Sequence, residues 1–114
     1  HLGVRRQRQM CIRDRAMSVH VIAVVDVTDA DTFGKYGERA NEAVMAHGGK
    51  VVSISGPNKP ALEDTGAAST ARFVLIEFPS AEDAQGWMSD PEFQSVHELR
   101  RGGAKTTIRL MTPR

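Results

Sequence analysis

The sequence has very little of several residue types on which common chemistries depend. Its 114 residues include one cysteine, one tryptophan and one tyrosine, and aromatic residues make up 5% of the chain. Cys11 alone cannot form an intramolecular disulfide, and residues 17–114 have no thiolate to serve as a nucleophile or metal ligand. No apolar segment approaches the roughly 20 residues that span a bilayer. We therefore expect no membrane insertion and a reducing compartment such as the cytoplasm.

Basic charge is concentrated at one end of the chain. Five of the 15 basic residues lie within the first 16 positions, where Asp14 is the single acid. The whole chain has 15 basic and 14 acidic residues. Without the five basic residues and Asp14, residues 17–114 contain ten basic and thirteen acidic residues, a net charge of −3. A domain of that sign has no general attraction for a phosphate backbone, so nucleic-acid binding is not expected.

Residues 1–16 have no helical or alternating apolar period, no capping residue and no signal-peptide core. A basic arm for RNA or acidic lipid and a disordered tail are two interpretations. The third, which we favour, is that 6–15 resembles a peptide translated from sequencing-adapter DNA at the end of a metagenomic gene fragment. We therefore expect a non-native or disordered leader at 1–16, a natural start at Met17, and one domain at 17–114.

Apolar periodicity and turn residues in 17–114 predict alternating strands and helices. Strands are expected at 19–26, 50–55, 71–78 and 105–111, and helices at 30–47, after Ser80 and again after Asp90. The apolar stripe of the first helix consists of Phe33, Gly37, Ala40 and Val44. One glycine of the pair at 48–49 should form a left-handed helix end, and 56–70 should be a long loop.

The order of strands and helices is that of the α+β ferredoxin-like βαββαβ motif, with a four-stranded antiparallel sheet. Right-handed crossovers predict that the first and third strands are neighbours in the centre, and we expect this pair to be parallel. Both helices should then cover a single face of the sheet. The fold class follows from element order alone, before any residue is assigned a role.

The central strands are apolar at both parities, which predicts a second buried face. One parity contains Val21, Ala23, Val25, Phe73 and Leu75, and the other contains Ile22, Val24, Val74 and Ile76. One layer of helices can bury only one of these faces. An open apolar sheet face is typical of an interaction surface, so we expect a symmetric homodimer stacked through its sheets.

The segments 25–29, 48–49, 72–80, 89–93 and 99–100, together with Tyr36, resemble the domain of unknown function 1330 family. The resemblance extends over nearly all of 17–114. It implies a branch of the dimeric α+β barrel superfamily, whose members include small monooxygenases, lactone isomerases and haem-handling proteins. It implies no particular reaction, substrate or cofactor for this chain.

Three positions differ from the pattern of that family. The arginine that the family often has near the end of the second strand is absent from 53–56, and the tryptophan of the following loop is absent from 62–66. Phe93 occupies a position where a tyrosine is common. Pocket chemistry that depends on these three groups is therefore not expected here.

Acids and amines are expected to meet at one sheet edge. If the first and third strands are parallel, Asp26 and Glu77 end at the same edge, where Lys50 and Lys105 begin the other two strands. Glu77 is the stronger candidate for a general base, because a carboxylate on the helix-covered face would have a raised pKa or need a partner. Asp26 is a candidate ligand-binding group. A solvated cluster of strand ends is the alternative.

The last helix supplies a second pair of candidates. His97 and Arg100 are three residues apart, so both can lie on one side of the helix. Arg100 would bind an anion and His97 would donate a proton, whereas the alternative is a solvated helix face. The histidines are otherwise too scattered for a metal site, and none is expected.

Two further residues are candidates for ligand binding. Tyr36 lies beside the apolar stripe, either at the edge of the core or with its hydroxyl in a pocket. Arg72 begins the third strand and could bind an anion or pair with an acid such as Glu63.

Two functions remain open from the sequence. One is a small-molecule enzyme or ligand binder with a pocket between sheet and helices, and the other is a non-catalytic dimeric interaction module. An enclosed apolar pocket reached by Glu77, His97 or Arg100 would favour the first, and a filled interior the second.

Overall fold

The computed structural model describes residues 18–56, 62–63, 65–66 and 71–114, so the predicted leader and most of the long loop lie outside the described residues. The strands are β1 (Val19–Val27), β2 (Lys50–Ser55), β3 (Arg72–Phe78) and β4 (Ala104–Met111). The helices are α2 (Ala30–Ala46), α3 (Ala81–Ser89) and α4 (Gln94–Gly103), with a 3₁₀ turn at Pro91–Phe93 between the last two. The predicted element order is confirmed, with boundaries shifted by a residue or two.

Side-chain and glycine caps define the ends of α2. The Asp29 carboxylate accepts hydrogen bonds from the backbone N–H groups of Asp31, at 3.1 Å, and Thr32, at 3.3 Å. These are two of the donors that a helix leaves without a partner at its first turn. At the other end, Gly48 has a φ of 75°, and the Gly49 N–H donates to the Val44 carbonyl at 3.0 Å. The predicted left-handed helix end is confirmed at Gly48, because that conformation carries a Cβ penalty for other residues.

The sheet has the strand order β2-β3-β1-β4, and all neighbouring strands are antiparallel. This confirms the ferredoxin-like α+β fold and the central place of β3. The expectation that β1 and β3 are parallel was wrong. Helix α2 carries the chain from β1 to a parallel β2, and β3 returns between them in the opposite direction.

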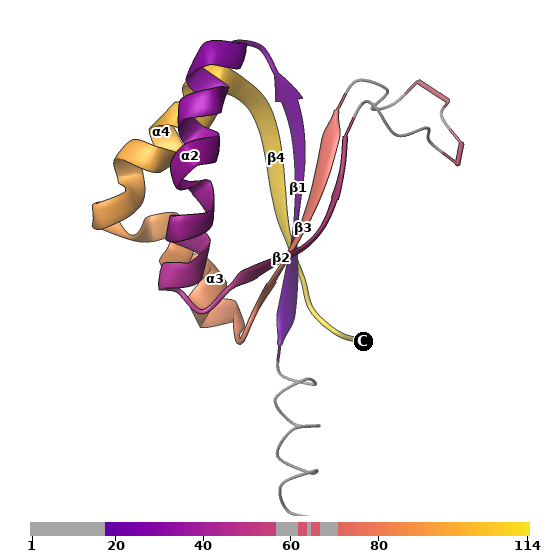
Figure 1. Cartoon of the computed structure of the whole chain (residues 1–114). Helices are drawn as coiled ribbons and strands as arrows, with labels where there is room; N and C mark the ends of the chain where they lie inside the picture. Colours follow the sequence, from indigo (N-terminus) through magenta and orange to yellow (C-terminus); the bar gives the residue numbers. More distant parts are fainter. Residues whose placement is uncertain (1–17, 57–61, 64, 67–70) are drawn as a thin grey trace, which may run out of the picture.

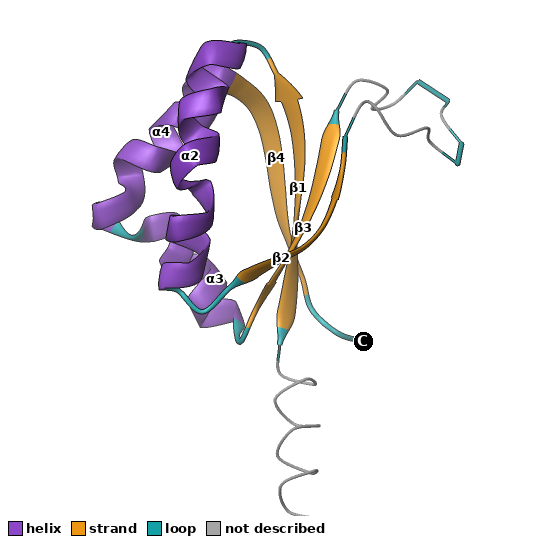
Figure 2. Cartoon of the chain, viewed as in Figure 1, coloured by secondary structure: helices purple, strands orange, loops and turns teal. Residues whose placement is uncertain are grey.

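All three helices lie on one face of the sheet, and among the described residues no helix covers the other face (Figures 1 and 2). Val21 is opposite Ile76 and Ala23 is opposite Val74 in the β1–β3 register, and these residues face the helices. By the same register, Ile22 is opposite Leu75 and Val24 is opposite Phe73, on the open face. The grouping of Phe73 and Leu75 with Val21 was therefore wrong, because cross-strand partners, not odd or even numbers, share a face.

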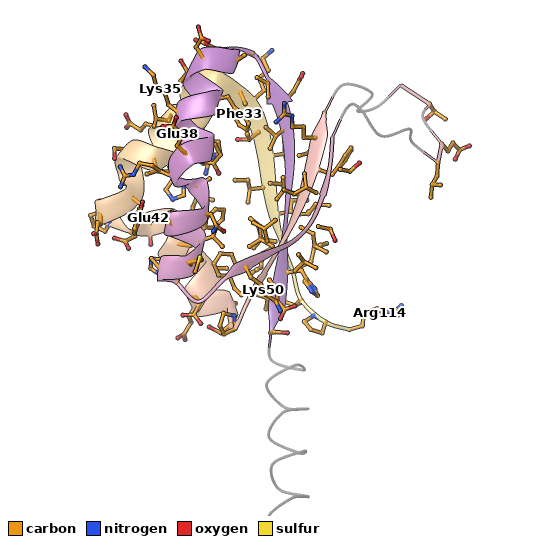
Figure 3. The ribbon with its side chains drawn as sticks, viewed as in Figure 1. Phe33, Lys35, Glu38, Glu42, Lys50 and Arg114 are labelled. Atoms are coloured by element: carbon orange, nitrogen blue, oxygen red, sulfur yellow. The ribbon has the colours of Figure 1, made fainter. Side chains whose placement is uncertain are left out.

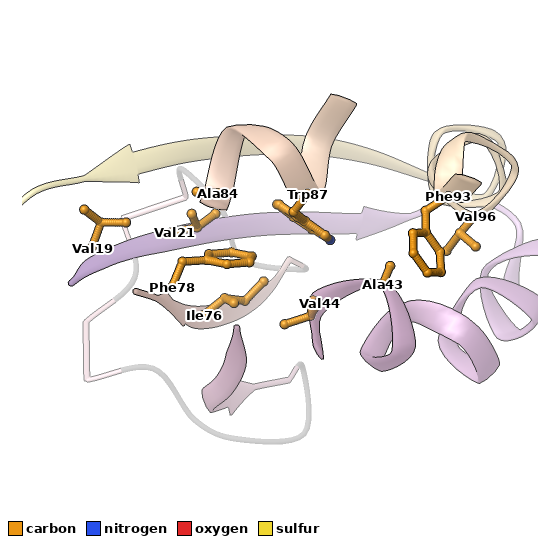
Figure 4. Packing of buried hydrophobic residues seen from close by; sticks show 10 residues of the cluster. All are labelled: Val19, Val21, Ala43, Val44, Ile76, Phe78, Ala84, Trp87, Phe93 and Val96. Carbon is orange, nitrogen blue, oxygen red and sulfur yellow. The ribbon is translucent and has the colours of Figure 1, made fainter. Parts of the chain in front are cut away.

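The main core lies between the helices and the part of the sheet formed by the start of β1 and the end of β3 (Figure 4). Phe78 and Trp87 are 0% and 2% exposed, and their ring centroids are 5.3 Å apart. A smaller cluster of Ala23, Val25 and Ala104 lies toward the other end of β1. No helix of the described chain combines the length and the apolar character that crossing a membrane requires.

Candidate functional site

A cavity of about 380 Å³ lies between α2 and the helix-covered face of the sheet. Its walls are mostly apolar, which is typical of sites for small organic molecules. From α2 it is lined by Phe33, Tyr36, Gly37, Ala40, Asn41 and Val44. From the strands it is lined by Val25, Val51, Ile54, Arg72, Val74 and Ile76. The cavity is partly open to solvent on its β2 side, where Val51 and Ile54 are 38% and 62% exposed. Contrary to expectation, none of Glu77, His97 and Arg100 lines it.

The cavity exists because α2 presents small residues to the sheet. Gly37 and Ala40 belong to the predicted apolar stripe, and all four residues of that stripe line the cavity. A Cβ added to Gly37 would meet nothing within 4 Å. In Figure 3, Phe33 lies on the sheet side of α2, whereas Lys35 lies on the outer side. The stripe thus leaves a space where larger side chains would have filled the core.

Two of the predicted ligand-binding residues reach this cavity. The rings of Tyr36 and Phe33 have centroids 5.3 Å apart, and the Arg72 guanidinium carbon lies 5.7 Å from the centroid of the Phe33 ring. Asn41 is the only other polar side chain in the lining, which contains no acid. Arg72 is exposed, and among the described residues no ion pair joins it to Glu63. The polar groups of the cavity are therefore mainly hydrogen-bond donors.

Burial reinforces the protonated state that the Tyr36 hydroxyl has at neutral pH. Desolvation raises the pKa of its hydroxyl above the ordinary value, and the positive charge of Arg100 acts against this rise. The phenol is therefore protonated at neutral pH. Tyr36 is suited to donating a hydrogen bond to an oxygen of a bound molecule, and it is not suited to acting as a base.

His97 and Arg100 form a buried pair, contrary to the alternative of a solvated helix face. Their side chains are 1% and 4% exposed. Arg100 Nη1 lies 2.7 Å from His97 Nδ1, and His97 Nε2 lies 2.8 Å from the Trp87 carbonyl oxygen. Since a guanidinium only donates and a carbonyl only accepts, Nδ1 must accept and Nε2 must carry the proton.

This arrangement removes His97 from the list of proton donors to a ligand. Its one N–H is used by the Trp87 carbonyl, close to the C-terminal end of α3. Desolvation is the main cause that lowers the pKa of His97, opposed by that hydrogen bond and assisted by the charge of Arg100. The neutral imidazole therefore joins α4 to α3, and its predicted catalytic role is not supported.

Asp26 and Glu77 do not meet at one edge, contrary to expectation. In the antiparallel sheet, Glu77 is opposite Lys50 and His20, whereas Asp26 is opposite Lys105 at the far end of β1. Because β3 runs antiparallel to β1, the end of β3 that carries Glu77 lies beside the start of β1, away from Asp26. Glu77 also lies on the open face, where its Oε2 is 3.7 Å from His20 Nε2. Neither acid lines the cavity.

The remaining histidine has a structural partner. His47 follows the C-terminal end of α2, and its Nε2 lies 2.8 Å from Asp90 Oδ2. The Glu92 backbone N–H, and secondarily the contact with His47, lower the pKa of Asp90. In the described part of the chain, no three histidine, cysteine or acidic residues are grouped as a metal site would require.

Sequence reasoning missed most of the cavity wall. The stripe on α2 was identified as a core face, and the strand residues that oppose it were assigned only to a sheet interior. One signal was available, since the stripe contains Gly37 and Ala40, which are too small to fill a layer between helix and sheet. The sequence could not indicate the part of the wall on β2. Which sheet face Val51 and Ile54 occupy depends on the pairing of β2 with β3, which shifts register between Val51 and Ser53.

A family model for the domain of unknown function 1330 (DUF1330) matches residues 18–113. The chain belongs to this family. The match covers the whole sheet and all three helices, and it agrees with the resemblance in the sequence. No curated protein sequence matches this DUF1330 protein.

Solved structures share the fold of this DUF1330 protein at low sequence identity. A protein of unknown function from Rhodopseudomonas palustris has a TM-score of 0.70 and 17% identity, covering 93% of this chain and 92% of its own. The cofactor-independent oxygenase SnoaB from Streptomyces nogalater has a TM-score of 0.62 and 14% identity, covering 87% and 95%. A nipsnap family protein from Agrobacterium tumefaciens has a TM-score of 0.56 and 20% identity, covering 86% and 89%. These likenesses show a common α+β barrel-type fold.

Proposed function

We propose that this DUF1330 protein binds a small, largely apolar molecule between α2 and the sheet and acts on it as an enzyme. The observation that supports this function is the apolar cavity of about 380 Å³, which has few and localised polar groups. Pockets of this kind bury most of the surface of a small ligand and orient it through a small number of hydrogen bonds.

The residues of the cavity suit a reaction in which the bound molecule supplies the reactivity. The lining contains no cysteine, serine, histidine or acid that could attack or deprotonate a substrate. It offers apolar enclosure and the donors of Tyr36, Asn41 and Arg72, which can orient a substrate and stabilise developing negative charge on oxygen. That SnoaB is a cofactor-independent oxygenase supports this class of chemistry by analogy of fold.

A cavity-filling substitution tests this function. Gly37→Leu places a side chain in the cavity without a backbone clash, because a Cβ at Gly37 meets nothing within 4 Å. The probe is N-phenyl-1-naphthylamine, a neutral fluorophore that brightens in apolar sites. We expect saturable binding to the parent and loss of binding to Gly37→Leu.

Gly34→Leu is the matched control. Gly34 is also in α2 and also has open space at its Cβ, but it does not line the cavity. It should bind the probe as the parent does. Equal binding to the parent and to Gly37→Leu, or no binding to the parent, would contradict the proposed site.

The open sheet face supports assembly with a second copy of the chain. Ile22, Val24, Phe73 and Leu75 form its apolar centre. The flanking strands add polar residues, and acidic Glu77 and basic Arg109 both lie on this face. A surface with an apolar centre and both signs of charge at its rim can pair with itself about a two-fold axis. We propose a homodimer through this face, and a reducing compartment such as the cytoplasm as its location.

A further inference from the structure

Arg100 is a buried cation whose contacts in the described chain include no acid. Its side chain is 4% exposed, its Nη1 lies 2.7 Å from His97 Nδ1, and its Nη2 lies 3.9 Å from Met88 Sδ. The guanidinium also interacts with the hydroxyl of Tyr36. Its Nε has no hydrogen-bond partner. Burying a charge without a countercharge costs several kcal/mol, which makes such a group rare unless another requirement maintains it. The guanidinium therefore lacks a negatively charged partner among these contacts.

The register of two helices locates Arg100 beside the cavity. Helices α2 and α4 run in opposite directions (Figure 1). Gly103 packs against Phe33 so closely that a Cβ on the glycine would lie 2.6 Å from the Phe33 backbone nitrogen. Toward the other end of both helices, Phe93 and Ala43 belong to one buried cluster (Figure 4).

Tyr36 and Arg100 lie between these two contacts, each about one turn from the contact of Phe33 with Gly103. Consistent with this, each of the two groups shifts the pKa of the other. Tyr36 lines the cavity and Arg100 does not, so Arg100 interacts with Tyr36 from outside the cavity wall.

The wall itself adds positive charge and no negative charge. Arg72 lines the cavity from β3, and no aspartate or glutamate is among the lining residues. Two guanidinium groups from different elements thus lie at or beside this largely apolar cavity. Electrostatic complementarity then favours a negatively charged occupant over a neutral one of the same shape.

We infer that the molecule bound in this cavity is an organic acid, an aromatic carboxylate, phenolate or enolate, whose anionic oxygen accepts a hydrogen bond from Tyr36 while Arg100 outside the cavity wall balances the charge. The inference rests on the proposed function and narrows its substrate class. It also explains why a protein would bury Arg100 without an acid of its own. The ligand, when bound, brings the missing negative charge.

The test compares two probes that differ in charge and little in shape, 2-naphthoate and 2-naphthamide, by isothermal titration calorimetry at neutral pH. We expect the parent protein to bind the acid about tenfold more tightly than the amide, the order of effect of one charge-assisted hydrogen bond. Arg100→Gln retains a donor for His97 and removes the charge. It should abolish the preference by weakening the acid alone, and Arg100→Lys should restore much of it.

Arg101→Gln is the matched control, because Arg101 is the next residue of α4 and is exposed. It should retain the full preference. Trp87 is the only tryptophan, so its fluorescence reports whether each variant is folded. If Arg100→Gln does not fold, Tyr36→Phe removes only the hydroxyl and should weaken the acid about tenfold without weakening the amide.

The outcomes separate this inference from the function on which it rests. Equal affinity of the parent for acid and amide, or equal weakening of both probes by Arg100→Gln and Tyr36→Phe, would overturn the inference while the cavity remained a binding site. Failure of the neutral naphthylamine probe to bind would overturn the proposed function, and the inference with it. If Arg101→Gln removed the preference for the acid as strongly as Arg100→Gln does, the preference would come from general surface charge. That outcome would also overturn the inference.

Discussion

Tyr36 allows the environment of the cavity wall to be measured directly by spectroscopy. It is the only tyrosine in the chain, so the near-ultraviolet absorbance of tyrosinate reports this one hydroxyl. Its environment combines the desolvation of the cavity wall with the positive charge of Arg100 from outside that wall. The two influences have opposite signs, and they can be separated by removing one of them.

We predict that the alkaline titration of Tyr36 has its midpoint above the ordinary value of about 10, because burial disfavours the phenolate. In Arg100→Gln the midpoint should rise further, since the opposing positive charge is gone. Rapid pH jumps, with Trp87 fluorescence as the check for native structure, give the titration before alkaline unfolding. An unchanged midpoint in the variant would place Arg100 too far from Tyr36 to act on it.

His97 makes stability depend on pH in a definite direction. Its pKa in the folded protein is lowered, mainly by desolvation, whereas in the unfolded chain it has the ordinary value of about 6.5. As the pH falls through that value, the unfolded state takes up a proton that the folded state resists. The free energy of unfolding contributed by His97 is therefore present above about pH 6.5 and is lost as the pH falls.

We predict that the free energy of unfolding decreases from pH 7 to pH 5, measured by urea unfolding. His97→Gln can still donate to the Trp87 carbonyl, and it should be about 1–3 kcal/mol less stable at pH 7 because the pairing with Arg100 is lost. Its stability should depend less on pH, with His20 and His47 common to both proteins. A variant with the same slope as the parent would show that His97 is not the group that titrates.

At the scale of secondary-structure elements, the contact between α2 and α4 decides the position of the functional groups. Gly103 is buried at this contact, and its carbonyl accepts hydrogen bonds from the backbone N–H groups of Thr28 and Asp29 at 2.9 and 3.0 Å. The end of α4 is thereby attached to the start of α2. Any change in this contact would move Arg100 relative to Tyr36.

We predict that Gly103→Ala destabilises the protein by about 1–3 kcal/mol, because its Cβ would lie 2.6 Å from backbone nitrogen of Phe33, which cannot move without shifting α2. Gly102→Ala is the control. Its Cβ would meet only Thr32 Cγ2 at 3.7 Å, an ordinary contact, and alanine favours a helix over glycine. Thermal or urea unfolding of the two variants measures the difference, and equal stability would contradict the close helix contact.

At the scale of the whole molecule, one sheet face is covered by helices and the other is open. Four apolar side chains of β1 and β3 lie together on the open face, with Phe73 38% exposed. Soluble monomers seldom leave a contiguous apolar surface of this kind in water. A second copy of the chain would cover it with an identical surface.

We predict a dimer at micromolar concentration by multi-angle light scattering. Leu75→Lys puts a charge in the centre of the open face and should give a folded monomer, because burying an unpaired ammonium is costly. Met45→Lys is the control, since Met45 is a 63% exposed apolar residue of α2. A monomeric parent, or dissociation by the control, would contradict assembly through the sheet.

The sequence by itself determined the element order, the fold class, both ends of α2 and the apolar stripe of that helix, because these depend on local periodicity and on backbone preferences. It also indicated Tyr36 and Arg72 through their positions beside that stripe and at a strand start. These features depend on interactions between residues that are close together in the sequence.

Only the tertiary structure decided the direction of β3 in the sheet and which side chains share a face of the sheet. The antiparallel return of β3 separated Glu77 from Asp26 and moved Glu77 to the open face, although its strand had been identified correctly. The packing of α4 on α2 buried Arg100 and His97, for which the helix pattern alone left open either a ligand-binding pair or a solvated helix face. The cavity likewise needs the facing of three strands against α2. Each of these depends on contacts between residues far apart in the chain, and local pattern does not specify them.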